Sequence, residues 1–250
     1  GRDGNAINIS GAVKSRTLAT GDGNDAISIA AAMNNLGGLV DSTTISLGKG
    51  ADALNITAER APGAVNVYAL SKSTIDAREG AEGDSLNIEG QVRDSNILTG
   101  EGSDNLSFSG VSSTSGTTPA YSGLQSANRS TFYELNVGGG DNNVSVSYER
   151  DSASTTSRSV GMSGYDFTSG SGNDSLSITA DYGVSNAPAT YTRAAEFNMG
   201  AGDDAFTVNA QYGGINRVNL NLGDGDDRIE ISMAQAAATP TSTPYIAVEN

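Results

Sequence analysis

An aspartate recurs along this chain at the same place in a short glycine-rich phrase. The phrase reads Gly-x-Gly-x-Asp followed by alternating apolar residues, and residues 200–208 give a clear copy of it. Its glycines permit a tight backbone turn with exposed carbonyl groups, and the aspartate places a carboxylate beside them. Because carboxylate and carbonyl oxygens are the ligands that a hard cation such as Ca²⁺ takes, the phrase predicts a calcium site at each turn.

The predicted ligands hold fixed positions in the phrase. The carboxylates are those of Asp25, Asp52, Asp84, Asp104, Asp174, Asp204 and Asp227. Two looser copies offer Asn142 beside Asp141, and Asp3 near Asn5. The carbonyls are those of the glycines two residues earlier: Gly23, Gly50, Gly102, Gly172, Gly202 and Gly225. A solvated turn is the alternative, because Asp and Gly are common in turns, but the recurrence at one register favours metal ligation.

Apolar residues alternate on both sides of each phrase, which indicates strands. Ile27 and Ile29 follow one turn, for example, and Leu220 and Leu222 precede another. Equivalent turns are about 20 to 38 residues apart, enough for one coil of a solenoid. We therefore expect an all-β fold of one domain, residues 1–250. It would be a right-handed parallel β-solenoid (β-helix) of about nine coils, with one Gly/Asp turn per coil and variable loops on the return side.

Two long return segments, residues 109–131 and 151–164, are rich in Ser, Thr and Gly, and we expect them to lie outside the core. Most of the tyrosines fall on or near such segments, where they would cover the core from the loop side. Exposed tyrosines also suit contacts with surface glycans.

The phrase resembles the calcium-binding repeat of the RTX family, G-G-x-G-x-D-x-U-x, where U is apolar. The resemblance covers nearly the whole chain, but with two departures. RTX rolls run their nine-residue copies back to back, two per coil, whereas this chain has one turn per coil. Most copies here also lack the first glycine, although Gly138-Gly139-Gly140 comes close. The resemblance therefore implies a single row of calcium turns along one edge.

The composition sets a problem that calcium would solve. Leu, Ile, Val and Phe make up under a fifth of the chain and the net charge is −15, which together are typical of disorder. The regular periodicity argues against disorder, so we predict folding that is coupled to Ca²⁺ binding. About one divalent ion between each pair of neighbouring turns would roughly neutralise the chain. With no His and no Cys, zinc, copper, haem and iron–sulfur sites lack their usual ligands.

The same composition bears on location and partners. The absence of Cys fits an extracellular bacterial protein, and millimolar extracellular calcium matches weak sites. No apolar run is long enough to span a membrane, and the acidity argues against nucleic acid as a partner. No signal peptide is evident and the chain opens inside a repeat, so we expect a processed or excised piece.

The two ends of the chain complement each other. The first residues, Gly1 to Ile9, form a turn with its outgoing strand, and the last, Tyr245 to Asn250, supply an incoming strand. We expect the solenoid to continue, either by head-to-tail stacking of copies or by further repeats in a longer chain. Fraying of both ends is the alternative.

Three classes of function remain. The first is an extracellular calcium-binding structural rod of a bacterial surface, such as an adhesin segment or a matrix fibre, and not an enzyme. A polysaccharide-active β-helix enzyme is the second class, but Arg150 and Arg193 belong to no convergent group in the sequence. A non-catalytic carbohydrate-binding module is the third.

Overall fold

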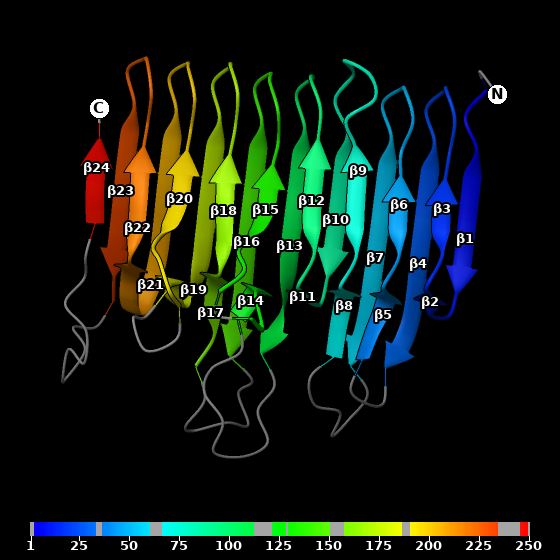
Figure 1. The fold of residues 1–250 in the computed structure, drawn as a ribbon, viewed down its shortest axis with the longest axis horizontal. Coiled ribbons are helices and arrows are strands. Elements are labelled where there is room, and N and C mark those ends of the chain that lie inside the picture. Colours follow the sequence, from blue (N-terminus) through cyan, green and yellow to red (C-terminus); the bar gives the residue numbers. More distant parts are fainter. Residues whose placement is uncertain are drawn as a thin grey trace.

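The computed structural model describes residues 3–33, 37–60, 67–112, 122–128, 130–150, 158–186, 191–234 and 246–249. Within these ranges the chain is all-β, and they contain no helix that could cross a membrane. The strands pair in parallel and stack along one axis, so the architecture is that of a β-solenoid (Figure 1). Each repeat, meaning the chain from one Gly/Asp turn to the next, contributes up to three successive strands.

The first strand of each repeat begins directly after the Gly/Asp turn. These strands are β1 (Ala6–Ser10), β4 (Ala26–Met33), β7 (Ala53–Arg60), β10 (Ser85–Glu89), β13 (Asn105–Ser112), β16 (Asn143–Arg150), β19 (Ser175–Ser185), β21 (Ala205–Asn216) and β23 (Arg228–Met233). Neighbours pair residue for residue, so that Leu86 of β10 lies between Leu54 of β7 and Leu106 of β13. The phrase thus sets the register of the sheet, because each copy starts its strand at the same residue.

The second strands are short and the third strands lead into the next turn. The second set is β2 (Val13–Lys14), β5 (Gly37–Asp41), β8 (Val67–Ser71), β11 (Gln91–Arg93), β14 (Ser122–Gln125) and β17 (Val160–Ser163). The third set is β3 (Thr17–Ala19), β6 (Thr44–Ser46), β9 (Thr74–Ala77), β12 (Asn96–Thr99), β15 (Tyr133–Asn136), β18 (Tyr165–Thr168), β20 (Ala195–Asn198), β22 (Val218–Asn221) and β24 (Ile246–Glu249).

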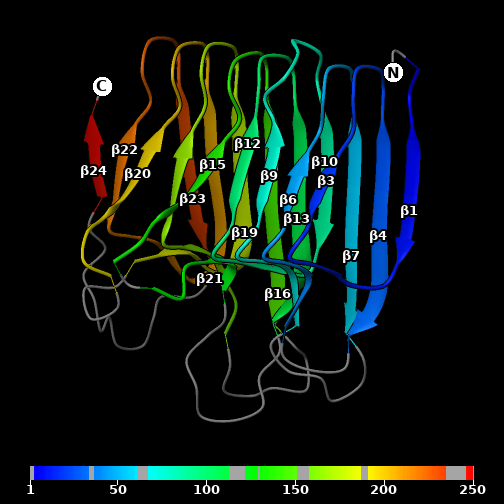
Figure 2. The ribbon, with the colours of Figure 1, turned by 45° about the vertical axis from the view of Figure 1, so that its right-hand side comes forward.

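Two sheets result from this arrangement. The third strands form a sheet of their own, whereas the first and second strands belong to one sheet because β19 spans both positions. Figure 2 shows the two sheets joined along the upper edge by the Gly/Asp turns. The core lies between them, where Ile56, Ile88 and Phe108 stack at equivalent positions and are fully buried. Burying one such side chain stabilises the fold by about 1.5–3 kcal/mol.

The two long return segments, residues 109–131 and 151–164, are not entirely the external loops that the sequence predicts. Leu124 of β14 and Met162 of β17 are fully buried, so the expectation that residues 109–131 and 151–164 lie outside the core is wrong for these parts. A short strand returns to the core in each case because one apolar residue there fills the space between the sheets. Residues 113–121, 129 and 151–157 of these segments lie outside the described residues.

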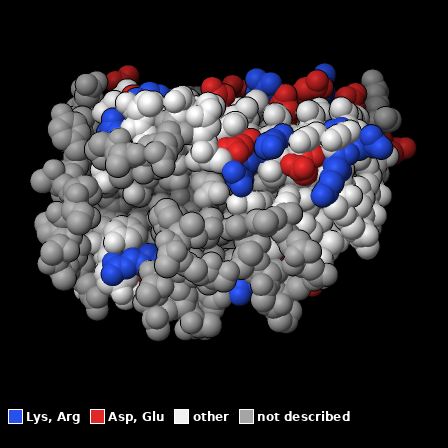
Figure 3. Space-filling model, turned by 60° about the horizontal axis from the view of Figure 1, so that its bottom comes forward, with Lys and Arg blue, Asp and Glu red and all other residues white. Residues whose placement is uncertain are grey.

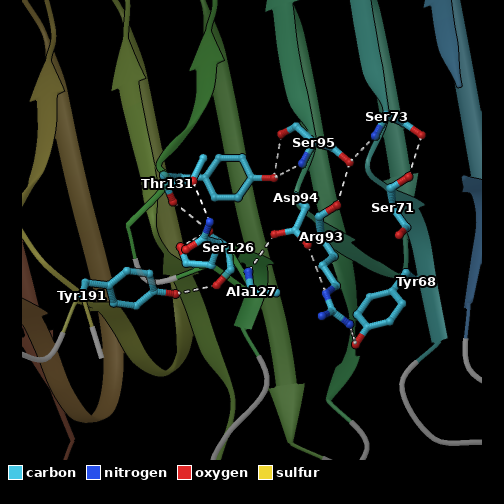
Figure 4. Close-up of polar contacts among 12 residues, drawn as sticks. Tyr68, Ser71, Ser73, Arg93, Asp94, Ser95, Ser126, Ala127, Thr131 and Tyr191 are labelled. Carbon is cyan, nitrogen blue, oxygen red and sulfur yellow. Dashed lines mark hydrogen bonds and ion pairs between the residues drawn. The ribbon is translucent and has the colours of Figure 1, made fainter. Parts of the chain in front are cut away.

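Buried polar contacts line the corner between the second and third strands. The Thr43 N–H donates to Ser73 Oγ at 3.2 Å. The Ser73 N–H donates in turn to Ser95 Oγ at 3.0 Å (Figure 4). The next corner, between β14 and β15, is longer and supplies no such serine. Instead the Tyr165 hydroxyl, 70 residues from Ser95, donates to the Ser95 carbonyl at 2.7 Å and accepts the Ser95 N–H at 3.3 Å. Tyr165 is therefore part of the core rather than a cover over it.

Candidate metal centre

The recurring aspartates of the phrase form one line along the upper edge of Figure 1, where the Gly/Asp turns lie. We call this line the aspartate column, and its members are Asn5, Asp25, Asp52, Asp84, Asp104, Asn142, Asp174, Asp204 and Asp227. The backbone N–H of every member but the last, Asp227, donates to side-chain Oδ1 of the member in the next repeat. From Asp25 onward these N···O distances lie between 2.7 and 3.0 Å. The structure therefore brings all seven predicted aspartates, and Asn142, into a single register.

From Asp25 to Asp204 the members of the column are buried, whereas Asn5 and Asp227 at its two ends are not. Asp52, Asp104, Asp174 and Asp204 are each at most 2 % exposed. Their backbone carbonyls accept N–H groups of the next repeat at 2.8 Å, as when Ser85 donates to Asp52. Backbone and Oδ1 contacts thus fix each turn against its neighbour.

The second carboxylate oxygen of these four residues has no hydrogen-bond partner. Oδ2 of Asp52, Asp104, Asp174 and Asp204 is buried and has no donor in hydrogen-bond geometry. Burial raises the pKa of the Asp104 and Asp174 carboxyls, and the hydroxyls of Thr99 and Ser169 act on these carboxylates and lower it in part. A buried carboxylate oxygen without a donor is strongly unfavourable, because its charge has lost water and gained nothing in return. A cation or a proton at this position would remove the penalty.

Asn142 shows what lies beside the second side-chain atom in its own turn, whereas at Asp25 this atom accepts the Gly21 N–H at 3.2 Å. Its Oδ1 accepts the Asp104 N–H in the same way as the aspartates, so its Nδ2 takes the place of their Oδ2. This Nδ2 donates to the carbonyls of Gly140 at 3.0 Å and Gly138 at 3.5 Å. Where the column residue is an aspartate, an oxygen takes the place of this Nδ2. An oxygen beside the turn carbonyls needs a positively charged partner.

Burial raises the pKa of most of these carboxyls. It raises the pKa of Asp84 to about 7 and the pKa values of Asp104 and Asp204 to about 6, although each accepts a backbone N–H, which lowers it. Burial also raises the pKa of Asp52 and Asp174. At Asp25 burial acts in the same direction, but hydrogen bonds from Asn5 and Gly21 outweigh it and leave that pKa lowered. The four carboxyls with an unpaired Oδ2 thus all have a raised pKa, and Asp84, whose Oδ2 is not among the unpaired atoms, has one as well.

The predicted glycines are required by the close stacking of the turns. Gly202 has φ +141°, and a Cβ there would lie 2.0 Å from the Gly172 carbonyl oxygen. The other predicted glycines lie at the same place in their turns with positive φ: Gly23, Gly50, Gly102, Gly172 and Gly225. Only glycine leaves room for the carbonyls of neighbouring turns to approach one another.

Asp141 and Asp3 lie outside the column. Both are exposed, and Asp141 instead accepts the Asn173 N–H at 2.7 Å. Asn173 accepts the Asp203 N–H and Asp203 accepts the Asp226 N–H, at 2.8 and 2.9 Å. This second, exposed row was not predicted, although a polar residue directly before the column position is its sequence signal.

The donor set of the column fits a hard cation. It offers an unpaired carboxylate oxygen at four turns, and glycine carbonyls lie beside the equivalent atom of Asn142, so the available ligands are oxygens. Among the described residues no three acidic side chains converge on one point. An ion held here would therefore take most of its ligands from the backbone.

A groove of about 630 Å³ lies beside β16, β19 and β21, and no column residue lines it. Glu149, Arg150 and Asp181 are among its polar lining. The Asp181 carboxylate accepts the Ser159 N–H at 3.0 Å, so its charge is used to hold two strands together. Arg193 pairs with Asp166 of β18 and therefore does not join Arg150 in a common site.

Charges on the opposite side of the molecule are mixed. On the face that Figure 3 shows, basic side chains lie among acidic ones. Arg78 with Asp76 and Arg228 with Glu230 are examples of such pairs elsewhere on the described surface.

Comparisons of this chain with protein-family models, with curated proteins and with solved structures find no match.

Proposed function

We propose that the chain is a calcium-binding structural rod of the RTX-like kind, a right-handed β-solenoid of about nine coils. The observation that carries the proposal is the row of buried Oδ2 atoms without a hydrogen-bond partner at Asp52, Asp104, Asp174 and Asp204. Asp52, Asp84, Asp104, Asp174 and Asp204 are its principal side-chain ligands. Asp25 and Asp227 occupy the same register nearer the two ends.

Calcium bound along the column would supply positive charge to the buried carboxylates and to a chain of net charge −15. Ion-free protein at neutral pH keeps a row of buried charges or must protonate them, and either costs free energy. Folding and ion binding are therefore coupled.

The role is structural and extracellular, at a bacterial surface or in its matrix, rather than catalytic. Besides Asp181, the described lining of the groove offers one acid, Glu149, and one arginine, Arg150, which is too little for acid–base chemistry of a known type. Millimolar extracellular calcium would keep weak oxygen-ligand sites filled.

The rod has open sheet edges that a further solenoid would cover. Within the described residues β1 pairs only with β4, and β23 pairs only with β21. Ile229 and Met233 of β23 are exposed. Such edges suit continuation by a second copy or by further repeats, which would hide them.

Far-UV circular dichroism with calorimetric calcium titration tests the proposal. We expect chelation to reduce the β signal and to lower the stability of the protein that remains folded, and added Ca²⁺ to restore both, with several ions bound per chain. Electron microscopy of the same samples would show rods or fibres only with calcium. A full β spectrum without calcium, combined with no heat of calcium binding, would rule the proposal out.

A further inference from the structure

We infer that Asn142 takes the place of a divalent ion in the aspartate column and divides it into two separate banks of ion sites. One bank extends from Asp25 to Asp104 and the other from Asp174 to Asp227. This inference rests on the calcium-binding function proposed above and specifies which turns bind an ion.

The hydrogen bonds of Asn142 supply what an ion would supply. Its Oδ1 accepts the Asp104 N–H at 2.9 Å, as an aspartate would. Its Nδ2 brings two N–H donors to the turn and reaches the carbonyls of Gly140 and Gly138. Asn142 is 2 % exposed, so water has little access to these groups. The carbonyls that would bind a cation are thus already satisfied by a neutral group.

The two flanking members of the column differ from Asn142 because their second side-chain atom has no hydrogen-bond partner. Asp104 and Asp174 each have a buried Oδ2 without a partner. A cation in the turn of residues 138–142 would meet the Nδ2 donors of Asn142, which repel it. This turn therefore binds no ion and needs none, so the middle of the rod stays ordered when the flanking banks lose calcium.

Three variants test the inference. Asn142→Asp restores an unpaired oxygen, and Asp174→Asn makes the opposite change in the next repeat. Asn143→Asp adds the same charge at an exposed neighbour and is the matched control. Bound Ca²⁺ per chain is measured by titration calorimetry and by metal analysis after dialysis, and unfolding in urea is measured in chelator.

We expect Asn142→Asp to bind one more ion than the wild type and Asp174→Asn one fewer. In chelator, the unfolding equilibrium constant should rise about tenfold or more for Asn142→Asp, because a buried acceptor loses its donor, and fall for Asp174→Asn. Asn143→Asp should match the wild type in bound calcium and lose much less stability than Asn142→Asp, because the Asn143 side chain is exposed and donates a hydrogen bond to Asn105 at the surface.

The outcomes separate the two proposals. If the wild type binds calcium but Asn142→Asp binds no additional ion, the inference is overturned while the proposed function stands. If no protein in the series binds calcium, the proposed function fails and the inference with it. Should Asn142→Asp not fold under any condition, Asp174→Asn decides, since an unchanged ion count there contradicts the inference.

Discussion

Ion-free protein should lose stability as the pH rises, which is opposite to the usual behaviour of proteins held together by ionised carboxylates. Asp104 is the clearest case, because it is 1 % exposed and burial raises its pKa to about 6, above the ordinary value of 3.8. The folded state then holds a proton that the unfolded state has released. This contribution to stability is complete below about pH 3.8 and is lost as the pH rises through about 6.

The magnitude follows from the shift. A difference of about 2 pKa units corresponds to about 3 kcal/mol, and about 2 kcal/mol of this falls between pH 4.5 and pH 7.5. Asp84 and Asp204 act in the same direction, since burial raises their pKa values too. Bound calcium reverses the sign, because protons then compete with the ion for the same oxygens.

Urea unfolding across this pH range, with chelator and with millimolar calcium, measures both slopes. Asp104→Asn is the control. Because its amide does not titrate, the free energy of unfolding of the ion-free variant should depend less on pH, by the amount that Asp104 contributes in the wild type. Ion-free stability that is constant or increases between about pH 4.5 and pH 7.5 would refute the reasoning.

Two further changes test the packing of the turns and of the opposite corner. Gly202→Ala should lower the free energy of unfolding by at least about 2 kcal/mol more than Gly11→Ala, measured by thermal or urea unfolding. The new Cβ at residue 202 would meet a backbone carbonyl, whereas a Cβ at residue 11 has open space at a similar φ. Equal losses of stability in the two variants would contradict the close stacking of the turns. Tyr165→Phe should destabilise by about 1–3 kcal/mol by leaving the backbone N–H and C=O of Ser95 unpaired. The half-buried Tyr133→Phe is its control, and an equal loss in both variants would show that the contact with Ser95 contributes little.

The register of the fold and the alignment of the aspartates could be predicted from the sequence. Each copy of the phrase starts a strand at a fixed residue, so Asp52, Asp84 and Asp104 had to align once the strands paired in parallel. The burial of these side chains could not be predicted, because recurrence gives a register but not the direction in which a turn residue points.

Other features were hidden by their length or their distance along the chain. The second strands, such as Val13–Lys14, are too short to show any periodicity. The contact between Tyr165 and Ser95 joins residues 70 positions apart and depends on the length of one corner. Asn142 was grouped with the ligands because an amide oxygen can bind Ca²⁺; only the structure shows that this oxygen already accepts the Asp104 N–H.

A crystal structure determined in millimolar calcium, with anomalous diffraction to locate the ions, tests the central claim most directly. We predict density for an ion beside Oδ2 of Asp52, Asp104, Asp174 and Asp204, close to the glycine carbonyls of the same turns. Stacked turns with no ion beside any of these oxygens would contradict the account.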